Sequence, residues 1–456
     1  MATYWQEHSL SIAPQVSGFG VVNSTDLDFK HIQGDKPKVQ FATEITEIEL
    51  MTGQIGAAPE RLIGRRHGTI GFSMPLEGLK VAFNPAAELL SEPDVLPPWI
   101  ALVGNSLGSY ITNTVDTAEK FWGGTHLSLS TYIAAGMASG TATTIVTDAD
   151  PETFEAGQLA VASASATSTS PQIGFIKTLD TGTKTLTLWD AAANNLNSAA
   201  ANIYGTATAW LSPVFSSQLP LTMRWRGERT EACYILQDCV CTSVKLTWES
   251  GAVPTVEFAF NFYEYTVDKT LGSLQTPVAF QRIPQIVGAN NGRVMLGKTT
   301  AGVFGSAVQC GLESCTWEYK SEISELKCHS SAQGISGVTY RKPRINVACS
   351  IPWTTADEVR NSAGTAGTAG SHLWQSILEL GQTLSLCVYV GTNVGRFFAF
   401  HVPAGKLVAV PQVTELNGTV GYQLQIEAGA YTGDTSSHAA TTTQCPIDSL
   451  CKVAVG

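Results

Sequence analysis

The stretch 69–75, with the sequence TIGFSMP, alternates apolar and polar residues and ends at a proline. The same plan returns in the C-terminal half at 346–352, with the sequence NVACSIP. Alternation with a period of two predicts a β-strand with one buried face. In both places a glycine follows the proline at the same distance of 29 positions (75 to 104 and 352 to 381). This spacing predicts two tandem copies of one β-rich domain.

Two further signals repeat at matching places. Apolar residues within 96–103 and within 374–378 recur with the i, i+3, i+4 spacing of one helix face, and each predicted short helix contains a tryptophan and ends at the glycine. Farther along, the alternating stretches 256–262 and 422–428 each lead to a Tyr-Thr pair. Each copy is therefore expected to be a β-sandwich or barrel with one short helix.

The copies differ by one insertion. Two residues separate Gly381 from Leu384, whereas the segment 105–218 separates Gly104 from Leu219. Four short strand-like stretches within the insertion predict a small all-β module: 144–147, 157–161, 173–176 and 184–189. Because insertions are tolerated at exposed loops, we expect this module to be separate and to face outward.

These features predict the domain organisation of the whole chain. The expected parts are an N-terminal arm (1–40), a discontinuous first tube-like domain (41–104 and 219–266), the inserted module (105–218), an interdomain linker (267–300), a second tube-like domain (301–434) and a C-terminal tail (435–456).

Composition excludes several classes of function. Only 14% of the 456 residues are charged and the net charge is −11, so a surface that grips nucleic acid through clustered Lys and Arg is not expected. The one basic cluster is 61–66. No stretch approaches the ~18 apolar residues of a membrane-spanning helix, and the N-terminus has no signal-peptide pattern, so we expect cytosolic synthesis and no membrane insertion.

The cysteines and the familiar catalytic motifs point away from chemistry. Without a secretory signal the ten cysteines are expected to be free thiols, with Cys349 on the apolar face of a strand. Cys445 and Cys451 are the best candidates for a disulfide formed after release from the cell. No phosphate-binding loop, zinc-peptidase motif or nucleophile elbow is present, so we expect no enzyme activity, cofactor or metal. The acidic run 148–152 is interpreted as a turn rather than a calcium site.

The chain resembles the tail tube proteins, the major tail proteins of long-tailed bacteriophages. The matching pattern is a strand, the Gly-rich loop 52–68, a strand closed by proline, a short helix and the strands of 233–262. The stretch 246–254, LTWESGAVP, followed by alternating aromatic residues, is especially similar to that family. The insertion departs from the minimal family pattern.

The resemblance implies a β-sandwich whose sheet joins those of its neighbours into a β-barrel channel for DNA. Duplicated members are similar to trimers that mimic six-fold rings. We therefore expect a structural virion protein that stacks as trimeric rings and is assembled in the host bacterial cytoplasm. Its implied partners are further copies of itself, the tape measure protein, and the tail terminator and tip proteins, while double-stranded DNA passes without specific binding.

The lumen of such a tube is expected to be negative, because like-charge repulsion keeps DNA from sticking. The candidate lumen-lining residues are Glu44, Glu47, Glu49, Glu318 and Glu322. The alternative for each is a charge that protects an exposed strand edge. The loops 52–68 and 328–340, together with the arm and the tail, are expected to be free to contact the next ring.

A different class of function stays open. A β-rich chain with little charge also fits a secreted or surface adhesin or carbohydrate-binding protein, although no export signal supports this. An enzyme is the third alternative. Tubes or rings in solution would favour assembly, and monomers would favour the adhesin.

Overall fold

The computed structural model describes part of the chain. The described residues are 9–15, 19–21, 29–32, 34–48, 60–75, 137–140, 144–147, 156–163, 172–189, 202–205, 207–211, 220–226, 233–249, 251–268, 292–300, 303–304, 308–309, 313–328, 334–353, 374–379, 381–393, 396–416, 418–431, 433–437 and 449–455. Within them the fold is mainly β, as the sequence predicts. No helix among these residues is long and apolar enough to cross a membrane.

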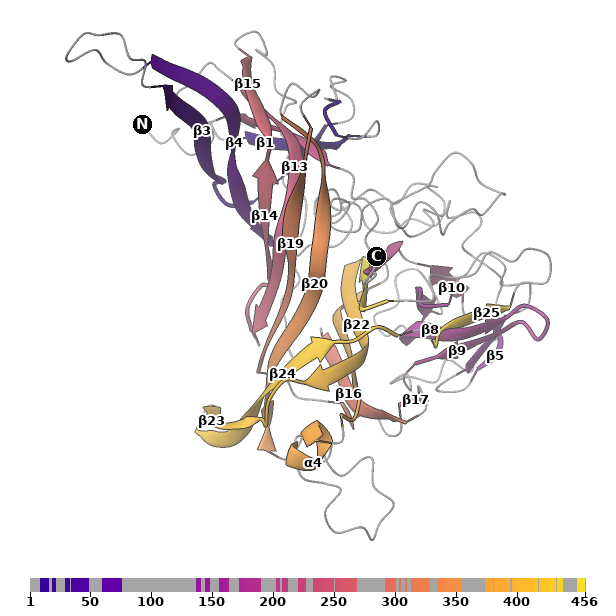
Figure 1. The fold of residues 1–456 in the computed structure, drawn as a ribbon. Coiled ribbons are helices and arrows are strands. Elements are labelled where there is room, and N and C mark those ends of the chain that lie inside the picture. Colours follow the sequence, from indigo (N-terminus) through magenta and orange to yellow (C-terminus); the bar gives the residue numbers. More distant parts are fainter. Residues whose placement is uncertain are drawn as a thin grey trace, which may run out of the picture.

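Long strands from both repeats lie side by side in one antiparallel sheet, which we call the shared sheet (Figure 1). The first repeat contributes, in spatial order, β3 (Lys38–Ile48), β4 (Glu60–Pro75), β14 (Thr255–Phe262) and β13 (Cys233–Glu249). The second contributes β19 (Ser314–Lys327), β20 (Ile335–Pro352), β24 (Thr419–Ala428) and β23 (Gln412–Leu416). The repeats join where β13 pairs with β19.

Each repeat also has an outer sheet. The first consists of β2 (Lys30–Ile32), β1 (Ser9–Pro14), β12 (Leu221–Arg226), the N-terminal half of β13, and β15 (Glu264–Asp268). The second consists of β16 (Gly292–Thr300), β21 (Leu384–Asn393), β22 (Arg396–Leu407), β26 (Cys451–Val455) and β11 (Ala207–Leu211), with the short β17 (Val303–Phe304) and β18 (Val308–Gln309) beside β16.

The two halves share one pairing plan. Pro75 lies opposite Thr255 at the end of β4, and Pro352 lies opposite Gly421 at the end of β20. The hairpins β3–β4 and β19–β20 both contain a β-bulge about midway along, and a bulge bends a strand pair locally. The outer sheets also correspond, because β1-β12-β13-β15 has the same order as β16-β21-β22-β26.

One face of the shared sheet packs on the outer sheets and forms a continuous core. The alternating residues that the sequence assigns to buried faces are indeed buried, among them Phe72 in the first repeat and Val347 and Cys349 in the second. Full burial of a side chain of this size contributes about 1.5–3 kcal/mol, so the alternating strands supply much of the stabilisation.

The helix of the second repeat is α4 (Trp374–Glu379), and Trp374 and Ile377 are buried on its inner side. Gly381 ends it with a positive φ of 59°. The backbone N–H of Gly381 donates to Leu378 (3.0 Å) and that of Gln382 to Ile377 (3.0 Å), the hydrogen bonds of a glycine C-cap. The helix expected at 96–103 lies outside the described residues.

Within the insertion the four predicted stretches form strands. The order of this sheet is β10 (Asn202–Gly205), β7 (Leu159–Ser163), β8 (Gln172–Asp180), β9 (Thr185–Leu188), β6 (Thr144–Thr147) and β5 (Met137–Gly140). The sheet has its own core, and Phe175 and Trp189 also pack on Tyr389 and Ala399 of the second repeat. Although inserted into the first repeat, the module therefore rests on the outer sheet of the second (Figure 1).

The domain boundaries stay a prediction, but the expectation of a free N-terminal arm and C-terminal tail needs correction. Parts of the arm and tail are sheet strands rather than free segments: β1, β26 and β25 (Thr435–Ser437), which pairs with β8. The expected linker also contributes a strand, β16. Apolar residues that alternate too briefly to stand out, such as Leu10 and Ile12, are buried in β1. Cys451 is a buried free thiol, and Cys445 lies outside the described residues.

Candidate subunit interface

The junction between the repeats is a complete example of edge-to-edge sheet pairing. Ser243–Glu249 of β13 runs antiparallel to Ser314–Lys320 of β19, with Leu246 opposite Trp317 and Val244 opposite Tyr319. These four side chains face the core and are fully or almost fully buried. Hydrogen bonding between the strands and apolar contact beneath them thus hold the two halves together.

The outer edges of the shared sheet repeat the parts of this junction. On β3, Val39 pairs with Ile70, and at the equivalent place in the second repeat Trp317 pairs with Val347. Val39 is therefore equivalent to Trp317, and Phe41 is equivalent to Tyr319. On the other edge, Val413 of β23 pairs with Tyr422 as Leu246 pairs with Val256. One edge is therefore equivalent to β19 and the other to β13.

Both outer edges lack a second strand among the described residues, since β3 pairs with β4 alone and β23 with β24 alone. The exposure of equivalent side chains reflects this difference. Leu246 is 0% exposed whereas Val413 is 63% exposed, and Tyr319 is 0% exposed whereas Phe41 is 39% exposed. Val408 and Val410 extend the exposed apolar edge before β23. Apolar residues on an unpaired strand edge mark a surface for pairing with another strand.

An ion pair fastens the far end of the internal junction. Arg65 of β4 donates to both carboxylate oxygens of Glu325 on β19, at 2.9 and 3.2 Å. Glu44 lies 3.4 Å from the same guanidinium, and the ring of Tyr263 lies 5.7 Å beneath it. The hydrogen bonds to Glu325 are the main cause of a raised Arg65 pKa. This two-pronged contact ties the hairpin of the first repeat to that of the second.

The second repeat carries part of the same arrangement. Lys342 and Glu322 occupy the places of Arg65 and Glu44, and they form the corresponding ion pair at 3.8 Å. The residue equivalent to Glu325 is Glu47 on β3, judged by backbone position. Glu47 pairs with Arg61 in the first repeat, and Glu325 pairs with Val338 at the same place in the second. Glu47 lies on β3, at the opposite outer edge of the shared sheet from β23.

Each predicted lumen residue whose side chain the structure describes lies next to a basic residue. Glu318 lies on the solvent-facing side of the shared sheet and contacts Lys320 at 2.7 Å. Glu44 and Glu322 are exposed at the two bulges, each with a basic partner. Glu47 is part of β3, and nothing is described of its side chain, while Glu49 lies outside the described residues.

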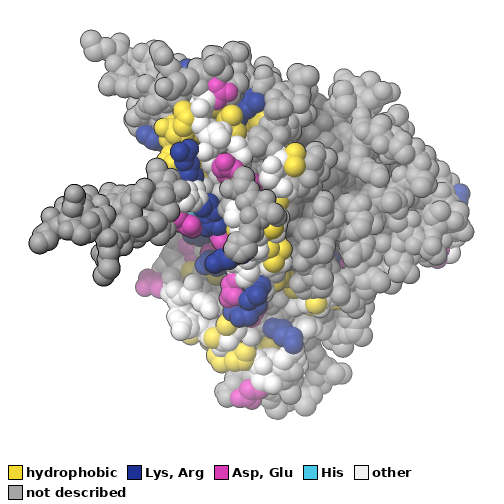
Figure 2. Space-filling view, turned by 45° about the horizontal axis from the view of Figure 1, so that its top comes forward, with side chains coloured by type: hydrophobic (Ala, Val, Ile, Leu, Met, Phe, Trp, Pro, Cys, Tyr) yellow, Lys and Arg dark blue, Asp and Glu magenta, His cyan; other side chains and the backbone are white. Residues whose placement is uncertain are grey.

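The solvent-facing side of the shared sheet carries charges of both signs. Figure 2 shows basic and acidic side chains interleaved along one face of the molecule. In the pairing register Lys245 lies beside both Glu257 and Glu318, and Arg344 forms an ion pair with Glu427 at 3.9 Å. The described part of this face is therefore of mixed charge rather than strongly acidic.

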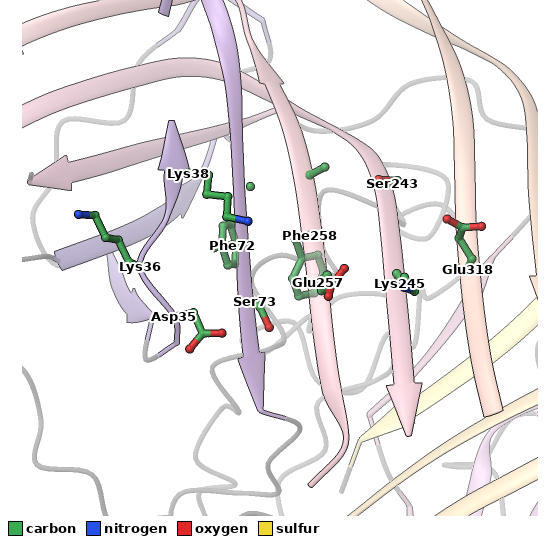
Figure 3. Close-up of a pocket in the computed structure, with 12 residues that line it drawn as sticks. Asp35, Lys36, Lys38, Phe72, Ser73, Ser243, Lys245, Glu257, Phe258 and Glu318 are labelled. Carbon is green, nitrogen blue, oxygen red and sulfur yellow. The ribbon is translucent and has the colours of Figure 1, made fainter. Parts of the chain in front are cut away.

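A hollow of about 410 Å³ lies on this face beside β3 (Figure 3). Its charged lining residues are Asp35, Lys36, Lys38, Lys245, Glu257 and Glu318. Lysines and carboxylates come from four different strands or their ends, and the described lining includes no histidine or cysteine. The lining thus offers no pairing of an activated nucleophile with a histidine base, and a polar, hydrated surface is the simplest interpretation.

Sequence reasoning identified the repeats but not the residues of the edges. Val413 and Phe41 carry no recognisable motif, and only their exposure beside buried equivalents sets them apart. Arg65 belongs to the basic cluster 61–66, so composition could have drawn attention to it. No protein-family model matches the chain, and no curated protein matches it.

Proposed function

We propose that this protein is a structural subunit of a bacteriophage tail tube, which polymerises as stacked trimeric rings around a channel for genome ejection into the host. The observation that carries the proposal is the internal junction. One chain joins two equivalent sheets edge to edge and leaves a matching edge at each end. The resemblance noted in the sequence supplies the kind of assembly.

The two outer edges are different surfaces, so contact between them is heterologous and either closes into a ring or continues as a filament. Three subunits provide six repeats, and closing their shared sheets into a barrel would leave no free edge. In this arrangement the polar face lines the channel. Its mixed charges present no continuous basic surface to bind passing DNA.

The internal junction also specifies the register between subunits. If β23 meets β3 of a second copy as β13 meets β19, Val413 lies opposite Val39 and Pro411 lies opposite Phe41. The same superposition brings Lys342 near the backbone position of Glu47 of the second copy, as Arg65 lies beside Glu325. Other partners under this proposal are the tape measure, terminator and tip proteins, with the assembled protein located in the virion tail.

Electron microscopy with symmetry averaging, together with native mass spectrometry of the purified full chain, tests this function. The expected result is hollow rings or tubes with three subunits in each ring. A monodisperse monomer at all concentrations would refute assembly and favour an adhesin or carbohydrate-binding protein. Six subunits in each ring would refute the role of the duplication.

A further inference from the structure

A charged pair is buried where the inserted module meets the second repeat. Lys452 of β26 is 0% exposed, and its ion-pair partner Asp434, just before β25, has a side chain that is 7% exposed. Two aromatic rings cover the lysine, with the Nζ atom 5.3 Å from the ring centre of Trp189 and 5.9 Å from that of Tyr431. The pair therefore lies in an almost dry aromatic cage.

The two ends of the pair are held differently. The Oδ1 atom of Asp434 accepts a hydrogen bond of 2.8 Å from Nε1 of Trp189, which fixes the carboxyl group. The Nζ atom of Lys452 lies against Oδ2, but it makes no hydrogen bond of ordinary geometry within the described residues. A buried ammonium is stable when several directed hydrogen bonds replace its hydration, and the described residues around Lys452 provide none of ordinary geometry.

We propose that Lys452 and Asp434 condense to form an intramolecular isopeptide bond. A proton first passes from the ammonium to Oδ2, which leaves a neutral amine beside a carboxylic acid. Nζ then attacks Cγ and the Nζ–Cγ bond forms. The Cγ–Oδ2 bond breaks, and Oδ2 departs as water with this proton and a second one from Nζ. The step needs no oxidant or co-reactant.

The surroundings favour the product over the ion pair. An amide carries no net charge, so its formation removes the cost of keeping two charges out of water. The hydrogen bond from Trp189 to Oδ1 serves the amide carbonyl as it serves the carboxylate, and it stabilises negative charge on that oxygen during the attack.

His401 is suited to carry the second proton. It lies opposite Lys452 in the β22–β26 register, and its Nε2 is 2.9 Å from Oγ of Ser385. Its Nδ1 is buried without a hydrogen-bond partner among the described residues. Burial, and then the Lys452 charge, lower the His401 pKa well below its usual range, so the ring would pass a proton on rather than hold it.

The bond would fasten the end of the chain. It closes a loop between the segment after β24 and β26, the strand that lies between β22 and β11. A cross-link of this kind limits the unfolded chain, as a disulfide does, but it cannot be reduced. The bond would then oppose the detachment of β26 from the outer sheet that supports the inserted module.

The mass of the intact, folded full chain tests the proposal. We expect the wild type to be lighter than its sequence by one water molecule, and a protease digest to contain one branched peptide that joins Lys452 to Asp434. Asp434→Asn should lose ammonia instead and reach the same final mass. Lys452→Arg should keep its full mass.

A neighbouring lysine provides the matched control. Nζ of Lys177, a residue of β8, lies 5.4 Å from the centre of the Trp189 ring, and Lys177 interacts electrostatically with Asp434. Lys177→Arg should still lose one water. Wild-type protein at its full sequence mass would overturn the proposal, and so would a water loss that persists in Lys452→Arg, which indicates a cyclic imide at Asp434.

Discussion

Replacing Val413 by aspartate tests the proposed subunit contact at its centre. Val413 is 63% exposed in the single chain, whereas Leu246, its equivalent in the internal junction, is fully buried. Full burial of a valine contributes about 1.5–3 kcal/mol, so covering the exposed part contributes roughly 1–2 kcal/mol at each junction. An unpaired carboxylate adds a desolvation cost, which brings the expected loss to at least about 2 kcal/mol. This corresponds to roughly 30-fold weaker association at each junction.

Sedimentation velocity over a concentration series measures this change, and circular dichroism establishes that the variant is folded. Val267→Asp is the matched control, because Val267 is also an exposed valine but lies on β15 of the outer sheet. The control should assemble as the wild type does. Assembly of Val413→Asp at wild-type concentrations, or equal weakening by both variants, would refute the edge-pairing argument.

Lys342→Glu is expected to weaken assembly a few-fold, since an exposed ion pair contributes about 0.2–1 kcal/mol. Adding Glu47→Lys should restore assembly, and sedimentation of both variants measures the change. A double variant that does not recover would contradict the proposed register. The folded chain binds a proton at His401 less readily than the unfolded chain, because burial lowers the His401 pKa. Stability should therefore fall as pH drops below about 6.5, and urea unfolding at several pH values should show a flatter dependence for His401→Gln. Burial raises the pKa of Cys349 to about 12, so brief treatment with iodoacetamide followed by peptide mapping should label the partly buried Cys328 well before Cys349. Equal labelling of the two would contradict the packing.

Several elements could be predicted from local sequence because their signals are local. Alternation placed the buried faces of β4, β20, β14 and β24, and the equal proline-to-glycine spacing predicted a second copy of the same plan. Gly381 could be recognised as a helix end, since only a residue without a side chain adopts its positive φ easily. Four short strands of the insertion were also found from their composition.

The candidate interface could not be predicted in this way. Leu246 and Val413 look alike in sequence, and what distinguishes them is that β19 covers one and no described strand covers the other. Strand partners and register depend on contacts between residues far apart in the chain, which no local pattern records. The predicted acidic residues illustrate the limit, because Glu318 lies opposite Lys245 only once β19 has paired with β13.

The sequence by itself determined that this chain is mainly β, that its two halves share one plan, and that a module interrupts the first half. Periodicity and spacing are enough for this, because they fix which side of each strand is apolar. The tertiary structure decided that the module rests on the second repeat, that β3 and β23 are the outer edges, and that Lys452 is buried against Asp434. These features depend on how the strands and the module pack together, which a local sequence pattern does not record.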